Sequence, residues 1–566
     1  MENQMRVVEL NSILPYLPLH LRSSSIFWPP PVVEALKALS KGPHYSNVHS
    51  GQILSLAILD LRNSLNYSSS KSLPSSALHG YSLFFDDLMP RADAVRWFEE
   101  VLPKMADLLL NLPSLLEAHY QQHNNAVDSR GRGVETTSCC LRLLDSQQPG
   151  LVLLSQELIA ALLSCSFFSL FPTANRAAKY LPMINFHHLF ASLYEYYEEN
   201  LESKIKCIVH YFERISSCMP MGNVSFERKV LPLDQRAVGI CYPKFDFWSK
   251  SDLPLCPFEV QRSGLIEDQV YEALEVDFAN QYLGGGALHR GCVQEEIRFM
   301  INLELVAGML FLPSMADNEA IEVVGTERFS NYIGYASSFR FSGDYVDHKD
   351  TDSLGRRKTR IIAIDALCGP GKRQYESECL LRDINKAFCG FCDLYKYQQY
   401  QEFFQDDEHW KSEVDFDVKQ LRERLRNDTL TLEGPSTSSQ LTEAALDTQL
   451  NRCSDEKACQ PSQHQEEIGI VTGNWGCGAF GGDPELKAII QWLAASQALR
   501  PFISYHTFGL DTLEVLDQVT RWILSHEWTV GELWNMLVEY GSKRLKGEIR
   551  VGFFSWLLPS RDSNDA

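Results

Sequence analysis

The stretch that decides the fold runs from Val276-Asp277-Phe278-Ala279-Asn280, through Gly284-Gly285-Gly286, to Gln294-Glu295-Glu296-Ile297-Arg298-Phe299. The first five residues are typical of a buried β-strand, and a helix begins within the last six. The three consecutive glycines permit positive φ angles and a close approach of the main chain to a ligand. This order predicts a strand that ends at a ligand site, with two glutamates in the first turn of the following helix.

Glu295 and Glu296 are the candidate acids of this site. Side chains of adjacent helical residues point about 100° apart, so both carboxyl groups reach one ligand only where the helix start faces the pocket. The helix dipole favours ionised carboxylates there, whereas burial and mutual repulsion raise the pKa of one of them. Two neighbouring carboxyl groups with separated pKa values suit glycosidic acid/base chemistry. The alternative, a favourable charge placement at a helix N-terminus, is weakened by the adjoining triple glycine.

A second glycine-rich stretch, Thr472-Gly473-Asn474-Trp475-Gly476-Cys477-Gly478-Ala479-Phe480-Gly481-Gly482-Asp483, lies between a predicted strand and a helix that begins near Pro484. Its unhindered main-chain amides can bind a diphosphate. It lacks the lysine and hydroxyl of a Walker loop and does not fit G-x-G-x-x-G with a downstream acid, which disfavours NTPase and Rossmann functions. A plain glycine turn stays open as the alternative. Tyr335 and Phe508 are candidates to stack on an adenine or ribose, although either one alone is more often a core residue.

Outward from these loops, the sequence from about Asn223 alternates short β-rich runs with helical periodicity. Strands are predicted at 273–278, 321–324, 360–365, 468–472 and 502–507, and helices at 294–309, 484–498 and 510–525. The alternation indicates an α/β layered sheet with ligand sites at the strand ends. From about Gly51 to Ile215, helical periodicity repeats and predicts a helical domain.

The chain of 566 residues exceeds what one core usually organises, so more than one domain is expected. Residues 1–222 are predicted to form an all-helical N-terminal accessory domain. The catalytic domain is predicted in two parts, 223–400 and 467–560. Between them, 401–466 is polar, acidic and poor in apolar anchors, which predicts a largely disordered insertion.

The amino-acid composition of the chain disfavours some classes of function. Hydrophobic residues make up 45% of the chain and charged residues 22%, as in ordinary globular proteins. The formal net charge of −21 disfavours broad nucleic-acid binding, so no direct DNA binding is expected. Fifteen cysteines, and no secretory leader in Met1 to Pro15, indicate a reducing intracellular compartment. The apolar stretch Leu151 to Phe171 is interrupted by Gln156 and Glu157 and predicts a buried helix rather than a membrane span.

Three other motifs suggest rival chemistry. Cys389-Gly390-Phe391-Cys392 has the spacing of a redox pair, but no thioredoxin-like context surrounds it, and structural thiols are favoured. No second cysteine pair with zinc-ligand spacing accompanies it, so neither a metal nor another cofactor is expected. His187-His188 lies on an apolar helix and is assigned to packing. Arg356-Arg357-Lys358 with Arg360 fits a nuclear import signal or a polymer track, although a solvated segment leading into a strand is favoured.

The strand, the triple glycine, the doubled acid and the second glycine-rich stretch together resemble the signature of the poly(ADP-ribose) glycohydrolases. The two motifs stand in the family's order, and the resemblance extends from the helical half, including Cys207-Ile208-Val209-His210-Tyr211-Phe212, to about Tyr540. It implies an α/β, macrodomain-like fold with a mixed sheet flanked by helices and preceded by a helical domain. It also implies a hydrolase that cleaves ribose-ribose O-glycosidic bonds of poly(ADP-ribose) to release ADP-ribose and acts in the DNA damage response.

By this resemblance the catalytic residues are Asp277, Glu295 and Glu296. Glu296 protonates the leaving ribose oxygen and then activates water against an oxocarbenium-like centre. Glu295 orients the ribose hydroxyls, and Asp277 supports the ribose. The remaining substrate-binding residues that the resemblance implies are Glu267 at the adenine, Asn280 at the ribose, Gln294 in the adjoining loop, Tyr335 and Phe508 as aromatic walls, Gly284, Gly285 and Gly286 in the triple glycine, and Gly476, Gly478, Ala479, Phe480 and Gly481 at the diphosphate.

The chain departs from the family pattern at His289 and Arg290, and at Leu303, where the family more often has proline; no catalytic effect is expected. Two other functions stay open. A non-catalytic ADP-ribose reader would not need Glu295 and Glu296, and a mono-ADP-ribosyl-protein hydrolase would use the same fold. The expected partners are poly(ADP-ribose) and poly-ADP-ribosylated proteins, and we expect a monomer in the nucleus and cytoplasm, without membrane association.

Overall fold

The computed structural model of the chain describes residues 2–22, 25–65, 73–122, 139–233, 241–269, 271–393 and 468–558. Nearly all of them belong to one compact unit, which comprises Met1–Cys392 and Gly469–Ala566. The predicted insertion at 401–466 lies outside the described residues, so its disorder stays a prediction.

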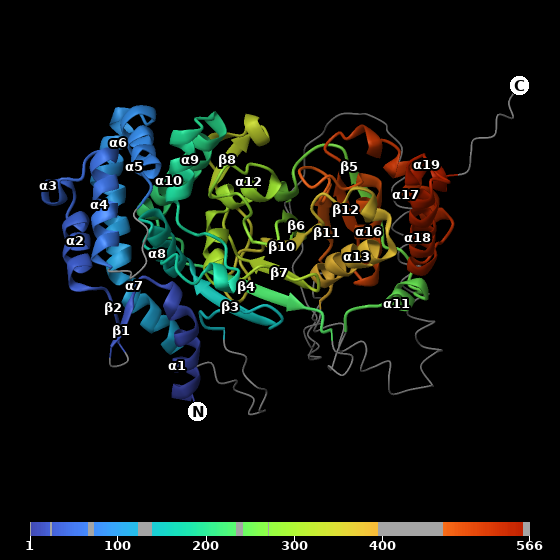
Figure 1. Cartoon of the computed structure of the whole chain (residues 1–566), viewed down its shortest axis with the longest axis horizontal. Helices are drawn as coiled ribbons and strands as arrows, with labels where there is room; N and C mark the ends of the chain where they lie inside the picture. The colour runs from blue at the N-terminus through green and yellow to red at the C-terminus, as the bar shows by residue number, and fades with distance from the viewer. Residues whose placement is uncertain are drawn as a thin grey trace, which may run out of the picture. The chain divides into compact units, whose positions relative to one another are not determined.

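Helices make up most of the first half of the chain (Figure 1). In α4 the Ser50 hydroxyl accepts a hydrogen bond from the main-chain N–H of Ile53, which caps the helix start. Leu54, Ile58 and Leu61 then recur on its buried face, as the periodicity predicts. The helices are α1 (Glu2–Ile13), α2 (Pro30–Ser40), α3 (Pro43–Ser46), α4 (Gly51–Ser64), α5 (Ser75–Ser82), α6 (Arg91–Arg96), α7 (Leu102–Gln122), α8 (Gln156–Phe167), α9 (His187–Glu195) and α10 (Glu199–Ser217).

The chain from Asn223 onward contributes seven strands of a mixed sheet of eight, in the order β3-β4-β7-β10-β6-β11-β12-β5. From β10 to β5 neighbouring strands run parallel, whereas β7, β4 and β3 add on antiparallel. The strands are β3 (Gly150–Ser155), β4 (Asn223–Val230), β5 (Phe258–Gln261), β6 (Leu274–Ala279), β7 (Glu319–Val324), β10 (Arg360–Asp365), β11 (Ile470–Gly473) and β12 (Ile503–His506). The predicted α/β class is therefore confirmed.

The N-terminal half is not helical throughout, contrary to the prediction for residues 1–222. β3 pairs with β4 along its whole length and forms an edge of the large sheet. Two short strands, β1 (His20–Arg22) and β2 (Ser25–Phe27), form a separate antiparallel pair. The run Gly150–Ser155 becomes a strand because β4 provides a partner from a distant part of the chain, which local periodicity does not reveal.

Helices of the second half flank the sheet. They are α11 (Phe245–Ser249), α12 (Gln294–Ile301), α13 (Ser377–Phe391), α16 (Pro484–Gln497), α17 (Leu516–Ser525), α18 (Val530–Lys546) and α19 (Phe553–Leu557). α13 and α16 pack against each other, and α12 packs against β6. The predicted helix 294–309 is wrong beyond Ile301, because Asn302 leaves the helical region at φ −116° and ψ 67°. A 3₁₀ helix, Leu303–Leu310, follows it.

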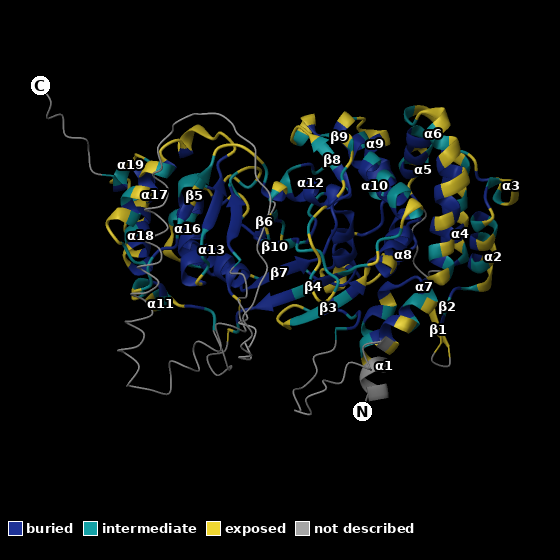
Figure 2. Ribbon diagram, turned by 180° about the vertical axis from the view of Figure 1, so that it is seen from behind, coloured by how far each residue is buried: buried dark blue, intermediate teal, exposed yellow. Residues whose placement is uncertain are grey.

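The core lies along the sheet, whose central strands are dark blue in Figure 2. All six residues of β7 are buried. The apolar stretch Leu151 to Phe171 divides into β3 and α8, and every residue of α8 except Glu157 is buried. Among the described helices, none combines the length and apolar character that a membrane crossing requires. The predicted buried helix is therefore confirmed for α8 but wrong for Leu151 to Ser155, which belong to β3.

Candidate active site

Three parallel strands bring the predicted residues to one edge of the sheet. β6 contains Asp277 and leads to Asn280, β11 leads to the second glycine-rich stretch, and β12 leads to Phe508. A cavity of about 390 Å³ lies at this edge, here called the first cavity. Its lining includes eight of the predicted residues: Glu267, Gln294, Tyr335, Gly476, Gly478, Ala479, Phe480 and Phe508. Carboxyl ends of parallel strands are the usual place for ligands in such sheets.

Glu295 is fixed by the main chain of residues 280–293, here called the first glycine loop. Its Oε1 accepts a hydrogen bond of 2.7 Å from the Gly284 N–H, and its Oε2 accepts one of 2.9 Å from the Asn280 N–H. The side chain is buried, with a relative exposure of 3%. Both carboxylate oxygens are thus held in place without a positively charged side chain.

Glu296 is held in the same way, by two other main-chain N–H groups of the same loop. Its Oε1 accepts from the Gly286 N–H and its Oε2 from the Val293 N–H, both at 2.9 Å. Gly285 adopts φ +47°, and a Cβ there would lie 2.6 Å from Oε2 of Glu295 and 2.9 Å from Oε1 of Glu296. Only glycine fits, because both the φ angle and the two carboxylates exclude a side chain.

Gln294 connects the acids to β6 and to the first cavity. Its Oε1 accepts from the Phe278 N–H at 2.8 Å, and its Nε2 donates to the Val276 carbonyl at 3.1 Å. The side chain thereby satisfies the exposed edge of β6 where the neighbouring strand has ended. It also lines the first cavity, so the start of α12 faces that space.

Three buried carboxyl groups gather here, and the pKa values of two of them, Asp277 and Glu295, are raised. Burial raises the pKa of Asp277 to about 7; the charge of Glu296 adds to the rise and Arg298 opposes it. Burial, followed by the charges of Asp277 and Glu296, also raises the pKa of Glu295 well above its usual range. Neither oxygen of Asp277 has a hydrogen-bond partner among the described residues. The group therefore retains a proton near neutral pH, which acid catalysis needs.

Arg298 does not neutralise this acidic cluster because it is paired elsewhere. Its Nη2 lies 2.6 Å from Oε2 of Glu275, whose Oε1 binds the Lys349 ammonium group at 2.6 Å. Although burial acts to raise it, Arg298 and Lys349 hold the pKa of Glu275 below its usual range. Sequence reasoning missed this charged triad, since its members come from three separate segments.

Lys204 of α10 is a second residue that sequence reasoning missed. Its buried ammonium group donates to the carbonyl oxygens of Gly286, His289 and Gly291 at 3.3, 2.8 and 2.5 Å. Burial lowers its pKa to about 8, although Cys292 and Glu296 act in the opposite direction. The lysine clamps the first glycine loop from the helical half, and no local motif around it signals that role.

The second glycine loop, residues 473–483, forms a compact turn over α16. Gly476 and Gly481 have φ angles of +74° and +72°, and the Gly482 N–H donates to the Gly476 carbonyl at 2.9 Å. The Asp483 side chain caps α16 by accepting from the Glu485 N–H at 3.0 Å. Such a turn directs main-chain amides outward, which suits an anion.

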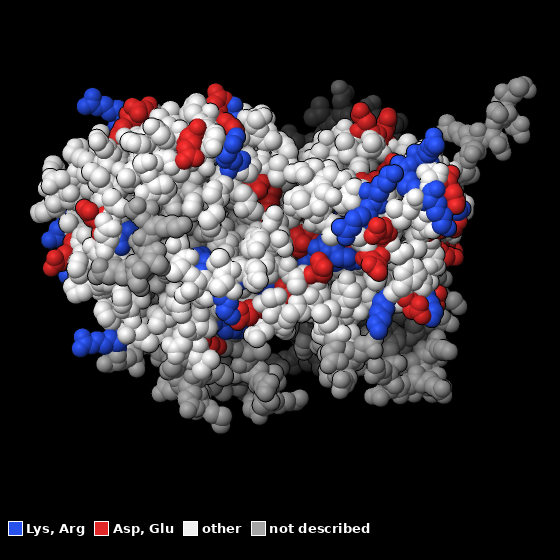
Figure 3. Space-filling view, in the orientation of Figure 1, with Lys and Arg blue, Asp and Glu red and all other residues white. Residues whose placement is uncertain are grey.

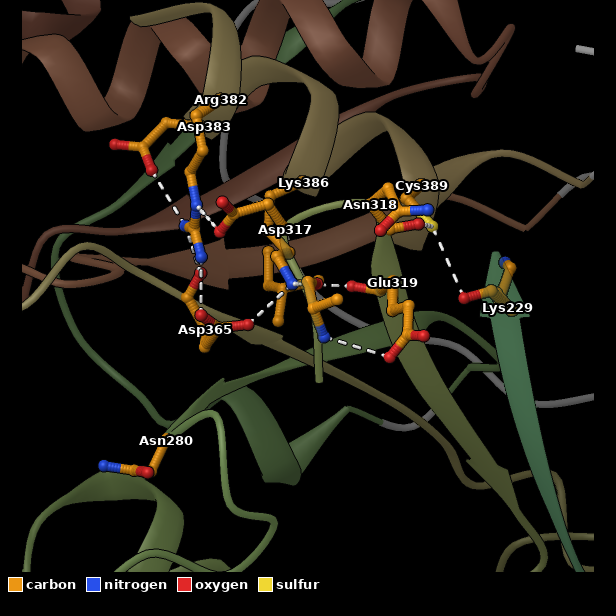
Figure 4. Close-up of polar contacts among 12 residues, drawn as sticks. Lys229, Asn280, Asp317, Asn318, Glu319, Asp365, Arg382, Asp383, Lys386 and Cys389 are labelled. Carbon is orange, nitrogen blue, oxygen red and sulfur yellow. Dashed lines mark hydrogen bonds and ion pairs between the residues drawn. The ribbon is translucent and has the colours of Figure 1, made fainter. Parts of the chain in front are cut away.

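An ion network that includes Asp365, Arg382, Asp383 and Lys386 (Figure 4) is linked to this loop through Lys487. Arg382 bridges Asp365 at 2.5 Å and Asp383 at 3.1 Å, and Lys386 binds Asp365 at 2.6 Å. Lys487 binds Asp383 at 2.5 Å and lies 4.2 Å from the ring centroid of Trp475 in the loop. Arg382 also binds Asp317 at 2.8 Å, so three carboxylates balance the three cations, and Lys487 places its charge against Trp475 of the loop.

Aromatic and acidic residues form another wall of the first cavity. Tyr332, which sequence reasoning missed, donates a hydrogen bond from its hydroxyl to Glu267. Phe508 is 46% exposed and stacks on His506 with ring centroids 5.8 Å apart, and Tyr335 is 54% exposed. Exposed aromatic rings beside a cavity suit stacking on a base. Asn474 also lines the cavity and was not among the predicted residues.

The remaining predicted residues lie outside the lining of the first cavity. Asp277, Glu295, Glu296, Gly284 and Gly286 lie behind it, buried or half-buried, and Gly481 stands at the far end of the second glycine loop. Asn280 and Gly285 line a second cavity of about 290 Å³. The structure therefore brings both loops to one site, with eight predicted residues in the lining of the first cavity, two in that of the second and six in neither.

The cysteine pair and the basic run, which suggested other chemistry in the sequence, make structural contacts. Cys389 lies buried near the end of α13, where its thiol is 3.4 Å from the Asn318 carbonyl. Arg356 binds Asp352 at 2.7 Å, and Arg357 binds Glu327 at 3.3 Å. On the face shown in Figure 3, basic and acidic side chains are interspersed. No group of three or more His, Cys, Asp or Glu side chains in the described ranges is arranged to hold a metal ion.

Comparison with known proteins shows which family models the chain matches. Residues 245–515 match the family model described as poly(ADP-ribose) glycohydrolase, macro domain fold. Residues 89–228 match the model for the helical domain of the same family. A doubled acid beside two glycine loops on a macrodomain sheet thus defines the class of this protein, a macrodomain with a helical domain in front.

Individual proteins that are similar to this chain carry the name of the same family. Poly(ADP-ribose) glycohydrolase 1 of Arabidopsis thaliana is 57% identical over 563 residues, covering 98% of this chain and 97% of that protein. A protein named probable poly(ADP-ribose) glycohydrolase 2, of the same plant, is 49% identical over 98% of both chains. Poly(ADP-ribose) glycohydrolase 1 of Caenorhabditis elegans is 29% identical over 60% of this chain and 35% of its own. The chain belongs to the poly(ADP-ribose) glycohydrolase family.

Proposed function

We propose that this protein hydrolyses the ribose-ribose O-glycosidic bonds of poly(ADP-ribose) and releases ADP-ribose. One observation carries the proposal: Glu295 and Glu296, at the start of α12, are buried and held by main-chain amides next to a cavity of about 390 Å³. A pure reader of ADP-ribose has no need for two buried acids. Membership of the family supports the same activity.

Glu296 is assigned the role of general acid and base. In its protonated form it gives a proton to the oxygen that bridges two riboses, and the bond from that oxygen to the anomeric carbon breaks. The resulting carboxylate then takes a proton from the water that attacks the anomeric carbon, which restores the acid. Glu295 and Asp277 hold the ribose, and their raised pKa values keep a proton available in the cluster.

The first cavity is assigned to the ADP-ribose unit that is released. Glu267, Tyr335 and Phe508 contact the adenine and its ribose, as their place in the cavity wall supports. Gly476, Gly478, Ala479, Phe480 and Gly481 bind the diphosphate through main-chain amides. The distal ribose then lies over Gln294, Asn280 and the triple glycine Gly284, Gly285 and Gly286.

The other expectations from the sequence are kept as part of this proposal. Residues 1–222 form a helical accessory domain, and 223–400 with 467–560 form the catalytic domain. The partners are poly(ADP-ribose) and poly-ADP-ribosylated proteins, in the nucleus and cytoplasm and in the response to DNA damage. The net charge of −21 supports a monomer that does not bind DNA directly.

Product analysis tests the proposal. The purified protein is incubated with poly(ADP-ribose), and separately with a protein that carries single ADP-ribose groups, and released ADP-ribose is quantified. Release from the polymer alone supports the proposed function. Release only from the singly modified protein would assign a mono-ADP-ribosyl hydrolase, and binding without any release would assign a reader.

A further inference from the structure

We propose that Asn200, in the first turn of α10, is a positioning residue that holds Tyr335 against the first cavity. The inference rests on the proposed function, in which Tyr335 contacts the adenine and its ribose. Tyr335 lies in the turn between two short antiparallel strands, β8 (Ser330–Ile333) and β9 (Arg340–Asp344), which form a sheet of their own. α10 belongs to the helical half of the chain and packs against β9 (Figure 2).

The turn that carries Tyr335 has an unfavourable backbone. Gly334 and Ala336, on either side of Tyr335, have positive φ angles of 75° and 53°. Alanine seldom adopts such a conformation, so the surrounding contacts must hold it there. Within the turn, the Ser338 hydroxyl accepts a hydrogen bond from the Tyr335 N–H at 3.0 Å and donates one to the Tyr335 carbonyl at 2.8 Å. These local bonds shape the turn but do not attach it to another part of the molecule.

Asn200 attaches the turn to the helical half. Its Nδ2 donates a hydrogen bond of 3.2 Å to the carbonyl oxygen of Ala336, the residue next to Tyr335. Asn200 itself is only 4% exposed, so packing fixes the position of the side chain that donates. The bond therefore connects a rigid helix to a backbone conformation that alanine does not favour.

Glu199, the preceding residue of α10, makes a weaker connection to the same turn. It pairs with Arg340, whose guanidinium group donates to the carbonyl oxygens of Ser337 and Phe339. The Glu199 side chain is 62% exposed, and ion pairs in water contribute little. The buried hydrogen bond of Asn200 is therefore the stronger of the two links.

The position of Tyr335 matters because its side chain lies close to the start of α12. Tyr335 and Gln294 both line the first cavity. Burial raises the pKa of Tyr335; a main-chain hydrogen bond from Gln294 opposes the rise, and the charge of Glu296 adds to it. α10 also clamps the first glycine loop through Lys204. One helix thus holds both the tyrosine and the loop of the acids.

A double-mutant cycle with Tyr335 tests the assignment. Asn200→Ala and Asn200→Thr both remove the amide donor, and threonine fills most of the space that alanine leaves empty. Each is made alone and together with Tyr335→Ala, and four quantities are measured: the affinity for ADP-ribose, kcat and KM for poly(ADP-ribose), and the melting temperature. Asn535→Ala is the matched control, because it also removes an amide bond of 3.2 Å to a carbonyl oxygen, that of Ser249, outside the lining of the first cavity.

We expect both Asn200 variants to weaken ADP-ribose binding and to raise KM about fivefold with kcat unchanged, and to have no further effect where Tyr335 is already alanine. Asn535→Ala should change neither the affinity nor the kinetic constants. A loss of the same size in the Tyr335→Ala background, a loss confined to kcat, or no loss at all would overturn the inference. Failure of both Asn200 variants to fold would do so too, since it would assign Asn200 to stability alone. The proposed function fails separately, if the wild-type protein releases no ADP-ribose.

Discussion

The ammonium group of Lys204, on α10, lies 2.8 Å from the main-chain oxygen of His289, on the loop that holds Glu295 and Glu296. The same group donates to Gly286 and Gly291, the glycines that flank Glu296. A Cβ on Gly291 would lie 2.6 Å from Oε1 of Glu296. One buried cation from the helical half therefore fixes the position of an acid in the other half.

Lys204→Met should remove most of the activity and lower the thermal stability. The carbonyl oxygens of His289 and Gly291 lose their lysine donor, whereas that of Gly286 keeps two main-chain donors, and each buried polar group left unsatisfied costs about 1–3 kcal/mol. Lys206→Met, on the same helix at an exposed position paired with Glu202, is the control and should retain activity. Thermal melts and rates of ADP-ribose release check the pair. Full activity in Lys204→Met would show that the loop does not depend on the clamp.

Gly291→Ala should abolish activity with only a moderate loss of stability. The new methyl group meets the Glu296 carboxylate and, at 2.8 Å, the Gly286 Cα, so the acid must move. Gly547→Ala is the control, because its φ of +75° makes alanine cost about 1 kcal/mol in an open position far from the acids. Comparison of kcat with the free energy of unfolding separates the two effects. A Gly291→Ala protein as active as the control contradicts the packed geometry.

The stability of the protein should depend on pH through Asp277. Its pKa is about 7 in the folded chain and about 3.9 when unfolded, so the folded state binds more protons between these values. The contribution is fully present below about pH 4 and is lost as the pH rises through 7, at up to about 1.4 kcal/mol per pH unit. Asp277→Asn cannot titrate. Urea unfolding from pH 4 to 8 should therefore show wild type losing stability relative to this variant, and parallel curves would refute the raised pKa.

Lys487→Met should weaken ADP-ribose binding about tenfold and leave adenosine binding unchanged, because only the former carries a diphosphate. The substitution removes the positive charge that lies 4.2 Å from the ring centroid of Trp475 in the second glycine loop, while Asp383 keeps Arg382 as a partner. Lys487→Arg retains the charge and should restore part of the affinity. Calorimetric titrations measure the affinity of each variant for both ligands. An equal loss of affinity for ADP-ribose and adenosine would indicate a structural role alone.

Much of the fold was predictable where local chemistry determines it. β6, β10 and β12 were predicted within one residue at each end because runs of apolar and β-branched residues mark them. α16 was predicted because Asp483 and Pro484 are strong start signals. In contrast, β3 needs β4 as a partner, and Asn302 ends α12 through a backbone conformation that the apolar periodicity hides.

The site was predictable to the extent that it lies in two continuous motifs. The doubled acid and the second glycine loop were found because unusual residues stand together. Lys204, Tyr332 and Lys487 act across the fold, and each by itself is an ordinary residue in its own segment. The division of the site into two cavities also depends on packing between distant segments, which no local pattern encodes.

The most direct test of the central claim is the rate of ADP-ribose release from poly(ADP-ribose) by Glu296→Gln, measured beside its affinity for ADP-ribose. Glutamine keeps the shape of the side chain, but its amide is too weak an acid to transfer a proton to the leaving oxygen. We expect release to fall by about 10²–10⁴-fold while ADP-ribose still binds. Undiminished release would contradict the assignment of Glu296 as the acid.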